Sequence, residues 1–204
     1  MSRERLAQGL KTGIKQRMKK LHFLVLAVAI IAGTTAGAQT FTSIKMGLNS
    51  GYLSGFEGRD RLSGHIGLAL HHRIDRNWSI QPEILFSGEG QVYISSDGEE
   101  RTLALDYVQL PLMFQYHLAK PIFFEFGPQL GLLVSARDKG FEVLNVREDF
   151  APAQLGLNLG IGLRATANIG FYGRYAFGLS DVSRFDNIVD QSRVGQLGMT
   201  IRLR

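Results

Sequence analysis

Residues 154–164 read QLGLNLGIGLR, and this stretch decides the fold class of the chain. Leucine or isoleucine occupies every second position, while glycine, Gln154, Asn158 and Arg164 occupy the positions between them. A period of two places alternate side chains on opposite faces of a β-strand. The stretch therefore predicts a strand with one apolar face and one face of small or polar residues.

The same alternation recurs along the rest of the chain, with little helical spacing. We expect strands near residues 43–53, 62–74, 78–87, 102–117, 122–134, 153–165, 169–179 and 194–204. Their connections alternate between tight turns at 75–77, 118–121 and 166–168 and long loops at 54–61, 88–101, 135–152 and 180–193. Short periplasmic turns and long external loops are typical of bacterial outer-membrane barrels. The predicted fold is an all-β, eight-stranded antiparallel transmembrane barrel.

The first 38 residues differ from the rest in charge and hydropathy. They carry 7 Lys/Arg and 1 Glu, followed by 16 basic and 17 acidic residues, so no basic patch for nucleic acid is expected. An apolar run at 21–32 follows two lysines, and Ala36 and Ala38 form an A-x-A cleavage site before Gln39. We expect an upstream start-site extension at 1–17, a cleaved signal peptide at 18–38 and the exported barrel at 39–204.

Volume indicates which face of each strand meets lipid. Eight strands enclose only the space that side chains fill, so rows of four to six large apolar residues per strand would overfill the interior. The apolar face is therefore predicted to point outward. Five aromatic residues with outward parity lie beside the tight turns and are predicted to form a periplasmic girdle: Trp78, Phe114, Tyr116, Phe124 and Phe171.

The polar face is predicted to fill the lumen. The expected lumen polar network consists of Lys45, Glu83, Gln109, Glu125, Gln129, Asn158, Arg164, Tyr172, Arg174 and Arg202, with Asn49, Gln115 and His117 beside it. Buried charges need partners, and the expected ion pair is Glu125 with Arg164. A polar plug is the favoured role of this set, and a path for a substrate or ion is the alternative.

Two local features of the predicted strands lead to specific expectations. If the turn at 166–168 pairs Leu163 with Ile169, Gly160 lies opposite Tyr172 and Asn158 lies opposite Arg174. The prolines inside predicted strands are Pro82, Pro111 and Pro128. Because proline cannot donate a ladder hydrogen bond, each is expected to mark a bulge, a kink or a locally missing bond.

Three segments resemble one protein family. They are QPEILFSGEG at 81–90, DYVQLPLMFQYHL at 106–118 and FEFGPQLGLLVSA at 124–136, which resemble the PorT-like, porin-family outer-membrane β-barrel domain in the order of that family. The resemblance covers about residues 40–204 and is specific as a set of motifs. It implies a small outer-membrane barrel of a family mostly without assigned function, in which PorT itself is linked to type IX protein secretion.

Residues suited to catalysis or metal binding lack the required arrangement. The chain has no cysteine, and adjacent His71 and His72 point to opposite faces, without HxxxH or HExxH spacing. Ser63 and His65 lie near the outer rim, but their parity points inward, away from a lipid substrate. No catalytic residue, cofactor or metal is therefore expected.

The leading functional hypothesis is a monomeric structural or interaction barrel that acts through its extracellular loops. A type IX secretion assembly component, a narrow diffusion pore and a lipid-modifying surface enzyme remain as alternatives. The expected partners are outer-membrane lipid and the barrel insertion machinery. The loops either face only water or bind a protein or polysaccharide partner, because binding residues concentrate on loops that a rigid scaffold holds.

Overall fold

The computed structural model describes residues 40–54, 58–95, 97–140, 143–182 and 191–203. Apart from Thr40, the first residue of β1, the described strands all lie within one compact unit, Phe41–Arg204. The predicted extension, signal peptide and cleavage site lie outside the described residues. Within these residues, no helix is long and apolar enough to cross a membrane.

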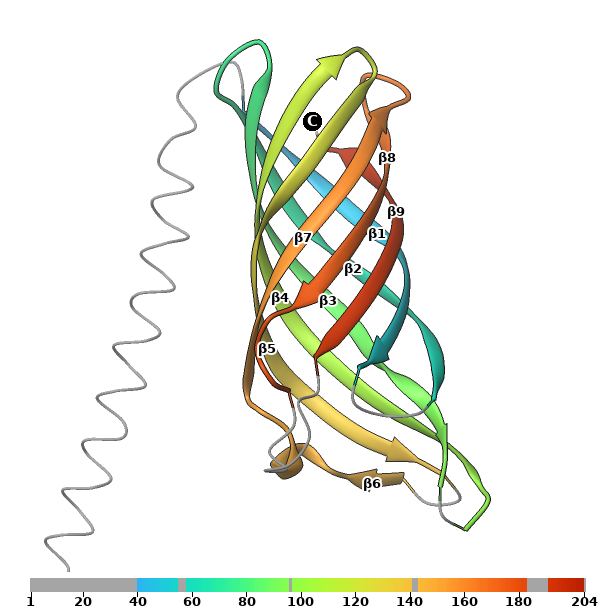
Figure 1. Ribbon diagram of the computed structural model, residues 1–204. Helices are drawn as coiled ribbons and strands as arrows, with labels where there is room; N and C mark the ends of the chain where they lie inside the picture. The colour runs from blue at the N-terminus through green and yellow to red at the C-terminus, as the bar shows by residue number, and fades with distance from the viewer. Residues whose placement is uncertain (1–39, 55–57, 96, 141–142, 183–190, 204) are drawn as a thin grey trace, which may run out of the picture. The chain divides into compact units, whose positions relative to one another are not determined.

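Eight strands close into a ring through antiparallel pairing (Figure 1). The elements are β1 Thr40–Leu53, β2 Arg59–Arg73, β3 Trp78–Ile94, β4 Glu100–Ala119, β5 Ile122–Lys139, β6 Val143–Asn145, the 3-10 helix η1 Arg147–Asp149, β7 Ala153–Arg164, β8 Ile169–Gly178 and β9 Ser192–Arg202. The ring order is β4-β3-β2-β1-β9-β8-β7-β5, and a β4–β5 pairing closes it. The prediction of an eight-stranded antiparallel barrel is confirmed; β6, which pairs only with the end of β5, is an addition.

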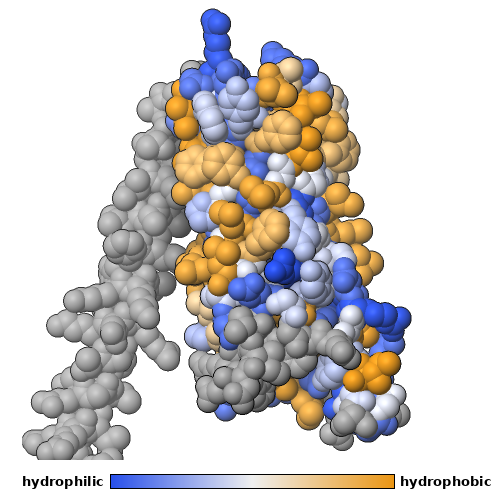
Figure 2. All heavy atoms as spheres, in the orientation of Figure 1, coloured by the Kyte–Doolittle hydropathy of each residue, from blue (hydrophilic) through white to orange (hydrophobic). Residues whose placement is uncertain are grey.

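The outer face of the ring is apolar and its interior is polar. Along β7, Leu155 and Leu159 are exposed while Asn158 between them is fully buried. This distribution reverses that of a water-soluble protein, in which large apolar side chains are buried and polar ones are exposed. Figure 2 shows apolar side chains gathered over the strands on the face in view. Such an apolar band is what a hydrocarbon surrounding favours.

The strands on one side of the barrel are longer than predicted. The expected loop at 88–101 is wrong, because β3 continues to Ile94 and β4 begins at Glu100. Glu89 and Gln91 caused the error, since both polar side chains are buried inside the barrel and were interpreted as loop residues. The expected loop at 135–152 likewise contains the end of β5, β6 and η1. These extensions lie at the end opposite the tight turns, called here the long-loop end (Figure 1).

Each of the three strand prolines lies where one ladder is interrupted. The β2–β3 pairs skip Pro82, the β3–β4 pairs skip Pro111, and the β4–β5 pairs skip Pro128. The register on either side of each gap is unchanged, so these prolines do not mark bulges. The predicted loss of a ladder bond is therefore confirmed, and the predicted bulge is wrong.

The register of β7 with β8 differs by two residues from the expected one. Leu163 pairs with Phe171, Gly162 with Tyr172 and Gly160 with Arg174. The shift arises because Ile169 closes the turn, accepting a hydrogen bond from the Thr166 backbone N–H at 3.0 Å. The expected opposition of small and large residues is retained with different partners, since Gly162 faces the tyrosine and Gly160, in place of Asn158, faces the arginine.

Candidate functional site

Four charged side chains form a closed cluster at the centre of the lumen, called here the ion network: Lys45, Glu83, Glu125 and Arg174. The Lys45 Nζ lies 2.8 Å from Glu83 Oε1. The Arg174 guanidinium bonds both carboxylates, with Nη2 2.9 Å from Glu83 Oε1 and Nε donating to Glu125 Oε1 at 2.9 Å. All four residues are at most 5% exposed. Two positive and two negative charges therefore neutralise each other across the barrel.

The backbone of the neighbouring strand makes room for this network. Arg174 on β8 pairs with Gly160 on β7, which has no side chain to fill the lumen there. A Cβ on Gly160 would lie 3.1 Å from Glu125 Cγ and 2.7 Å from the Gly173 carbonyl oxygen. Glycine at this position thus lets the arginine fork reach across to β3 and β5.

Neutral side chains satisfy much of the remaining hydrogen-bonding capacity of the ion network. Gln81 Nε2 donates to Glu83 at 2.7 Å, and Gln115 Nε2 donates to Glu125 at 3.1 Å. The Tyr172 ring lies against Lys45, whose Nζ is 3.9 Å from the ring centroid. Buried charges are tolerated when they are paired, hydrogen-bonded and in contact with an aromatic face in this way.

A second polar layer follows along the lumen. His65 Nδ1 bonds Asn49 Oδ1 at 2.6 Å, and His65 Nε2 bonds the Tyr172 hydroxyl. On the opposite wall, Asn158 Nδ2 donates to Gln129 Oε1 at 3.0 Å. The predicted lumen residues in both layers are thus buried where the parity of their strands placed them.

Nearer the long-loop end lies a buried carboxylate that the sequence analysis missed. Glu89 is 1% exposed and accepts hydrogen bonds from the side chains of Gln109, Gln154 and Ser192. Among ion pairs between described residues, none includes Glu89. The signal that marks it in the sequence is the alternation of Glu83, Ser87, Glu89 and Gln91, which continues the inward face of β3.

An apolar cluster, called here the apolar plug, begins beside Glu89 and fills the barrel toward the long-loop end. Its buried members are Leu53, Leu103, Leu105, Tyr107, Leu133, Ala136, Phe150 and Val182. Phe150 and Val182 belong to connections between strands and pack against inward residues of β1, β4 and β5. Sequence reasoning missed the plug because it assigned a polar lumen to every strand and left these connections as exposed loops. A packed apolar layer excludes water from this part of the barrel.

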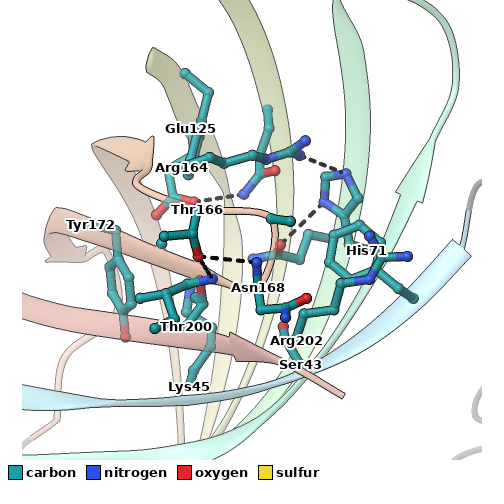
Figure 3. A pocket seen from close by; sticks show the side chains of 17 residues that line it. Ser43, Lys45, His71, Glu125, Arg164, Thr166, Asn168, Tyr172, Thr200 and Arg202 are labelled. Carbon is teal, nitrogen blue, oxygen red and sulfur yellow. Dashed lines mark hydrogen bonds between the residues drawn. The ribbon is translucent and has the colours of Figure 1, made fainter. Parts of the chain in front are cut away.

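At the other end of the lumen, called here the short-turn end, two predicted network members lie apart from the ion network. The prediction that Arg164 pairs with Glu125 is wrong, because Arg174 occupies that carboxylate. Arg164 is the last residue of β7, and its Nη2 instead donates to His71 Nε2 at 3.0 Å (Figure 3). The Arg202 guanidinium carbon lies 4.1 Å from the centroid of the Phe41 ring. Both arginines line an open pocket at this end.

The five predicted girdle residues all lie on the outer face beside tight turns. Trp78 and Tyr116 are paired across β3 and β4 with ring centroids 5.0 Å apart, and Tyr116 also pairs with Phe124. Phe114 stacks on Phe126, which the prediction omitted, and Phe171 stands separately on β8. Their function as a membrane-interface girdle remains a prediction.

The turn at 75–77 is held by its own carboxylate. The backbone N–H groups of Asn77 and Trp78 donate to Asp75 Oδ1 at 2.7 and 2.8 Å. These two hydrogen bonds lower the pKa of the Asp75 carboxyl below its ordinary value. The backbone of the turn thereby stabilises the charged form of Asp75.

Residues considered for chemistry do not assemble into a reactive group. The Ser63 hydroxyl donates to the Gly88 carbonyl at 2.7 Å, whereas both nitrogens of the His65 ring bond Asn49 and Tyr172. In the described part of the chain, no three His, Asp or Glu residues lie close enough together to hold a metal ion. The described lumen side chains instead bridge neighbouring strands and fill the interior of the barrel.

Comparisons with known proteins agree with this architecture. The model of the outer membrane protein beta-barrel domain matches residues 9–184. No curated protein matches the chain. Ail, the attachment invasion locus protein of Yersinia pestis, is 12% identical over 81% of this chain and 99% of its own, with a TM-score of 0.50.

Neisserial surface protein A is also 12% identical, over 80% of this chain and 97% of its own, with a TM-score of 0.53. At this identity the two structures share the fold alone with this chain. The family match covers most of the chain, including all strands of the ring except β9. The chain therefore belongs to the outer membrane protein beta-barrel domain family and is a small barrel of the bacterial outer membrane.

Proposed function

We propose that this barrel is closed to solutes and works as a structural or interaction protein through its long-loop end. The observation that carries the proposal is the filling of the lumen at successive depths. The ion network crosses the centre, Glu89 and its amide partners follow, and the apolar plug seals the far side. A transported solute would have to break buried ion pairs and then pass an apolar layer.

The long-loop end offers a platform of the kind that binding proteins use. Arg101 bridges three acidic residues, with Nη2 2.6 Å from Asp97 and 3.7 Å from Glu99 and Nη1 3.8 Å from Asp138. These contacts link β4 to β5 and to the turn after β3. Beyond them, Ile94 is 73% exposed. A rigid scaffold that holds exposed side chains supports a role in binding.

A protein or a polysaccharide is the partner class proposed for this end. Ail, which shares the fold, is described in complex with the heparin analogue sucrose octasulfate. The extended end of this chain combines exposed apolar residues such as Ile94 and Val143 with the charged pair Arg59–Glu100. A mixture of apolar, positive and negative side chains complements a protein surface better than it complements a uniformly sulfated polysaccharide. We propose that the barrel itself is monomeric.

Site-specific photo-crosslinking in intact cells tests the proposed loop role. A photoreactive residue at Ile94 should give a discrete cross-linked product, because this side chain projects from the extended hairpin. Leu118 is the matched control, since it is similarly exposed and apolar but lies at the β4–β5 turn of the opposite end. The proposal would be contradicted if Ile94 and Leu118 gave the same cross-linked products, or if neither position gave any.

A part in type IX protein secretion is the second candidate. The observation that favours it is the resemblance of residues 81–90, 106–118 and 124–136 to PorT-like barrels. These three segments lie in β3, β4 and β5, the strands that extend the sheet at the long-loop end. Deletion of the gene followed by measurement of type IX cargo in the culture medium tests this role. Undiminished cargo secretion in the deletion strain would exclude it.

A further inference from the structure

Cations from four separate segments gather at the short-turn end. Arg73, Arg164 and Arg202 terminate β2, β7 and β9 with inward parity, and Arg76 and Lys120 lie in the adjoining turns. No ion pair between described residues includes any of the five. The sequence analysis missed this patch because the net charge of residues 39–204 is close to zero and the four segments that carry the cations are far apart in the chain.

Nearby carboxylates offset only part of this positive charge, since Asp75 interacts electrostatically with Arg73 alone among the five cations. Glu83 and Glu125 are balanced by Lys45 and Arg174 inside the ion network. Asp75 lies in the β2–β3 turn, and its carboxylate accepts the two backbone N–H groups of that turn. The short-turn end therefore retains an excess of positive charge, which attracts an anion.

A pocket lies directly between two of these arginines (Figure 3). It has a volume of about 50 Å³, and Arg164, Arg202, Thr166 and Thr200 line it. A water needs roughly 10–15 Å³ by the same measure, so the pocket admits a group of several heavy atoms. Its walls come from the ends of β7, β8 and β9, from the turn at 166–168 and from inward residues of β1 to β5, and it opens toward the solvent at the short-turn end.

Glycine at one position keeps this pocket hollow. Gly170 on β8 pairs with Arg164 on one side and with Thr200 on the other. A Cβ on Gly170 would lie 2.8 Å from Thr200 Oγ1 and 3.1 Å from the Leu163 carbonyl oxygen. The row Arg164–Gly170–Thr200 therefore presents donors on both sides of a space without a side chain.

Several groups that face the pocket are hydrogen-bond donors, and the Glu125 carboxylate, which also lines it, is already bonded by Arg174 and Gln115. Arg164 uses one N–H on His71, which leaves the rest of its guanidinium fork available. Arg202 lies over the Phe41 ring, and this contact uses the face of the guanidinium and none of its N–H donors. Thr166 Oγ1 already accepts the backbone N–H groups of Asn168 and Ile169, so its own O–H is free to donate. Guanidinium forks with hydroxyl donors recognise oxoanions.

We propose that this pocket binds one phosphate-type oxoanion between Arg164 and Arg202 over Gly170. The ligand is either free phosphate or the phosphate of a phospholipid headgroup from the adjacent leaflet. Both sources present at least two non-ester phosphate oxygens that can accept hydrogen bonds from the two guanidinium groups. The proposal is independent of the loop function proposed above, because it concerns the opposite end of the barrel.

Calorimetric titration of the folded barrel with inorganic phosphate tests the free-ligand source. The protein is held in a non-ionic, phosphate-free detergent at low salt, and folding of each variant is checked by heat-modifiable migration. We expect saturable binding that Arg164→Gln or Arg202→Gln weakens about tenfold or more, because each removes a charge-assisted hydrogen bond. Lys139→Gln is the matched control, since it removes one charge at the long-loop end and should change binding less than about twofold.

Native mass spectrometry tests the lipid source. Wild type and the two arginine variants are extracted from vesicles that contain phosphatidylglycerol, and retained phospholipid is counted for each. Loss of bound lipid in Arg164→Gln and Arg202→Gln would show that the pocket binds a phospholipid headgroup. If these variants weaken the binding of inorganic phosphate but retain as much lipid as the wild type, the ligand is free phosphate. Gly170→Ala, which fills the hollow without changing charge, should weaken whichever ligand binds. Equal binding by wild type and the arginine variants in both measurements would overturn the proposal.

Discussion

Replacement of Arg174 by methionine perturbs the lumen at its most connected point. Arg174 bonds Glu83 through two nitrogens and Glu125 through Nε, and all three side chains are buried. In Arg174→Met, Glu83 keeps Lys45 as its partner, but Glu125 keeps only the Gln115 amide. Removal of one partner from a buried ion pair costs about 3–5 kcal/mol, because the remaining charge stays desolvated. We expect a loss of unfolding free energy in that range.

Reversible urea unfolding in lipid vesicles measures this loss. Trp78 is the sole tryptophan, lies on the outer face beside a tight turn, and reports the transfer from lipid to water. Arg174→Lys keeps the charge but loses the fork, so it should cost about 1–3 kcal/mol. Adding Glu125→Gln to Arg174→Met should restore part of the lost stability, because the orphaned charge is removed with its partner.

The double variant distinguishes the charge argument from a simple packing defect. If the loss came from packing alone, Arg174→Met/Glu125→Gln would be at least as unstable as Arg174→Met. A loss below about 1 kcal/mol for Arg174→Met would refute the reasoning, since that is the value of an exposed pair.

Two further predictions follow from the faces and close contacts of the strands, and a third follows from the leader sequence. Leu159→Arg places a charge against hydrocarbon and should cost about 2–4 kcal/mol in the same unfolding assay, whereas the neighbouring inward change Asn158→Ser should cost about 1 kcal/mol. Gly127→Ala sets a Cβ 1.9 Å from a β4 carbonyl oxygen and should destabilise by about 1–3 kcal/mol, while Gly195→Ala, whose nearest contact is 3.8 Å, should be tolerated in heat-modifiable migration. N-terminal sequencing of the mature protein should begin at Gln39, and retention of the apolar leader would contradict that expectation.

The barrel and the direction of its side chains were predictable because strand parity is a local property. Leu159 and Asn158 are adjacent in the sequence. Alternation alone places Leu159 on the lipid-facing side of the strand and Asn158 on the lumen side. The tight turns were predictable for the same reason. Strand ends at the long-loop end were not, since buried polar residues such as Glu89 have the composition of a loop.

Partners across the lumen could not be predicted from parity. Arg164 and Arg174 both face inward, and the β5–β7 and β7–β8 registers together decide which of them reaches Glu125, since Glu125 pairs with Gly160 and Gly160 pairs with Arg174. A shift of two residues along one hairpin changed every cross-strand partner while leaving the faces unchanged. The apolar plug escaped prediction because Phe150 and Val182 enter the barrel from connections, where no periodicity marks them.

Planar-bilayer recording on the purified, heat-modifiable barrel tests the central claim of a closed lumen most directly. In about 1 M salt, where exposed charges are screened but buried pairs are less affected, we expect a silent trace. Arg164→Ala should also remain silent, because Arg164 lies outside the ion network and leaves both that network and the apolar plug intact. Sustained, stepwise conductance of porin size from the wild-type protein would contradict the account.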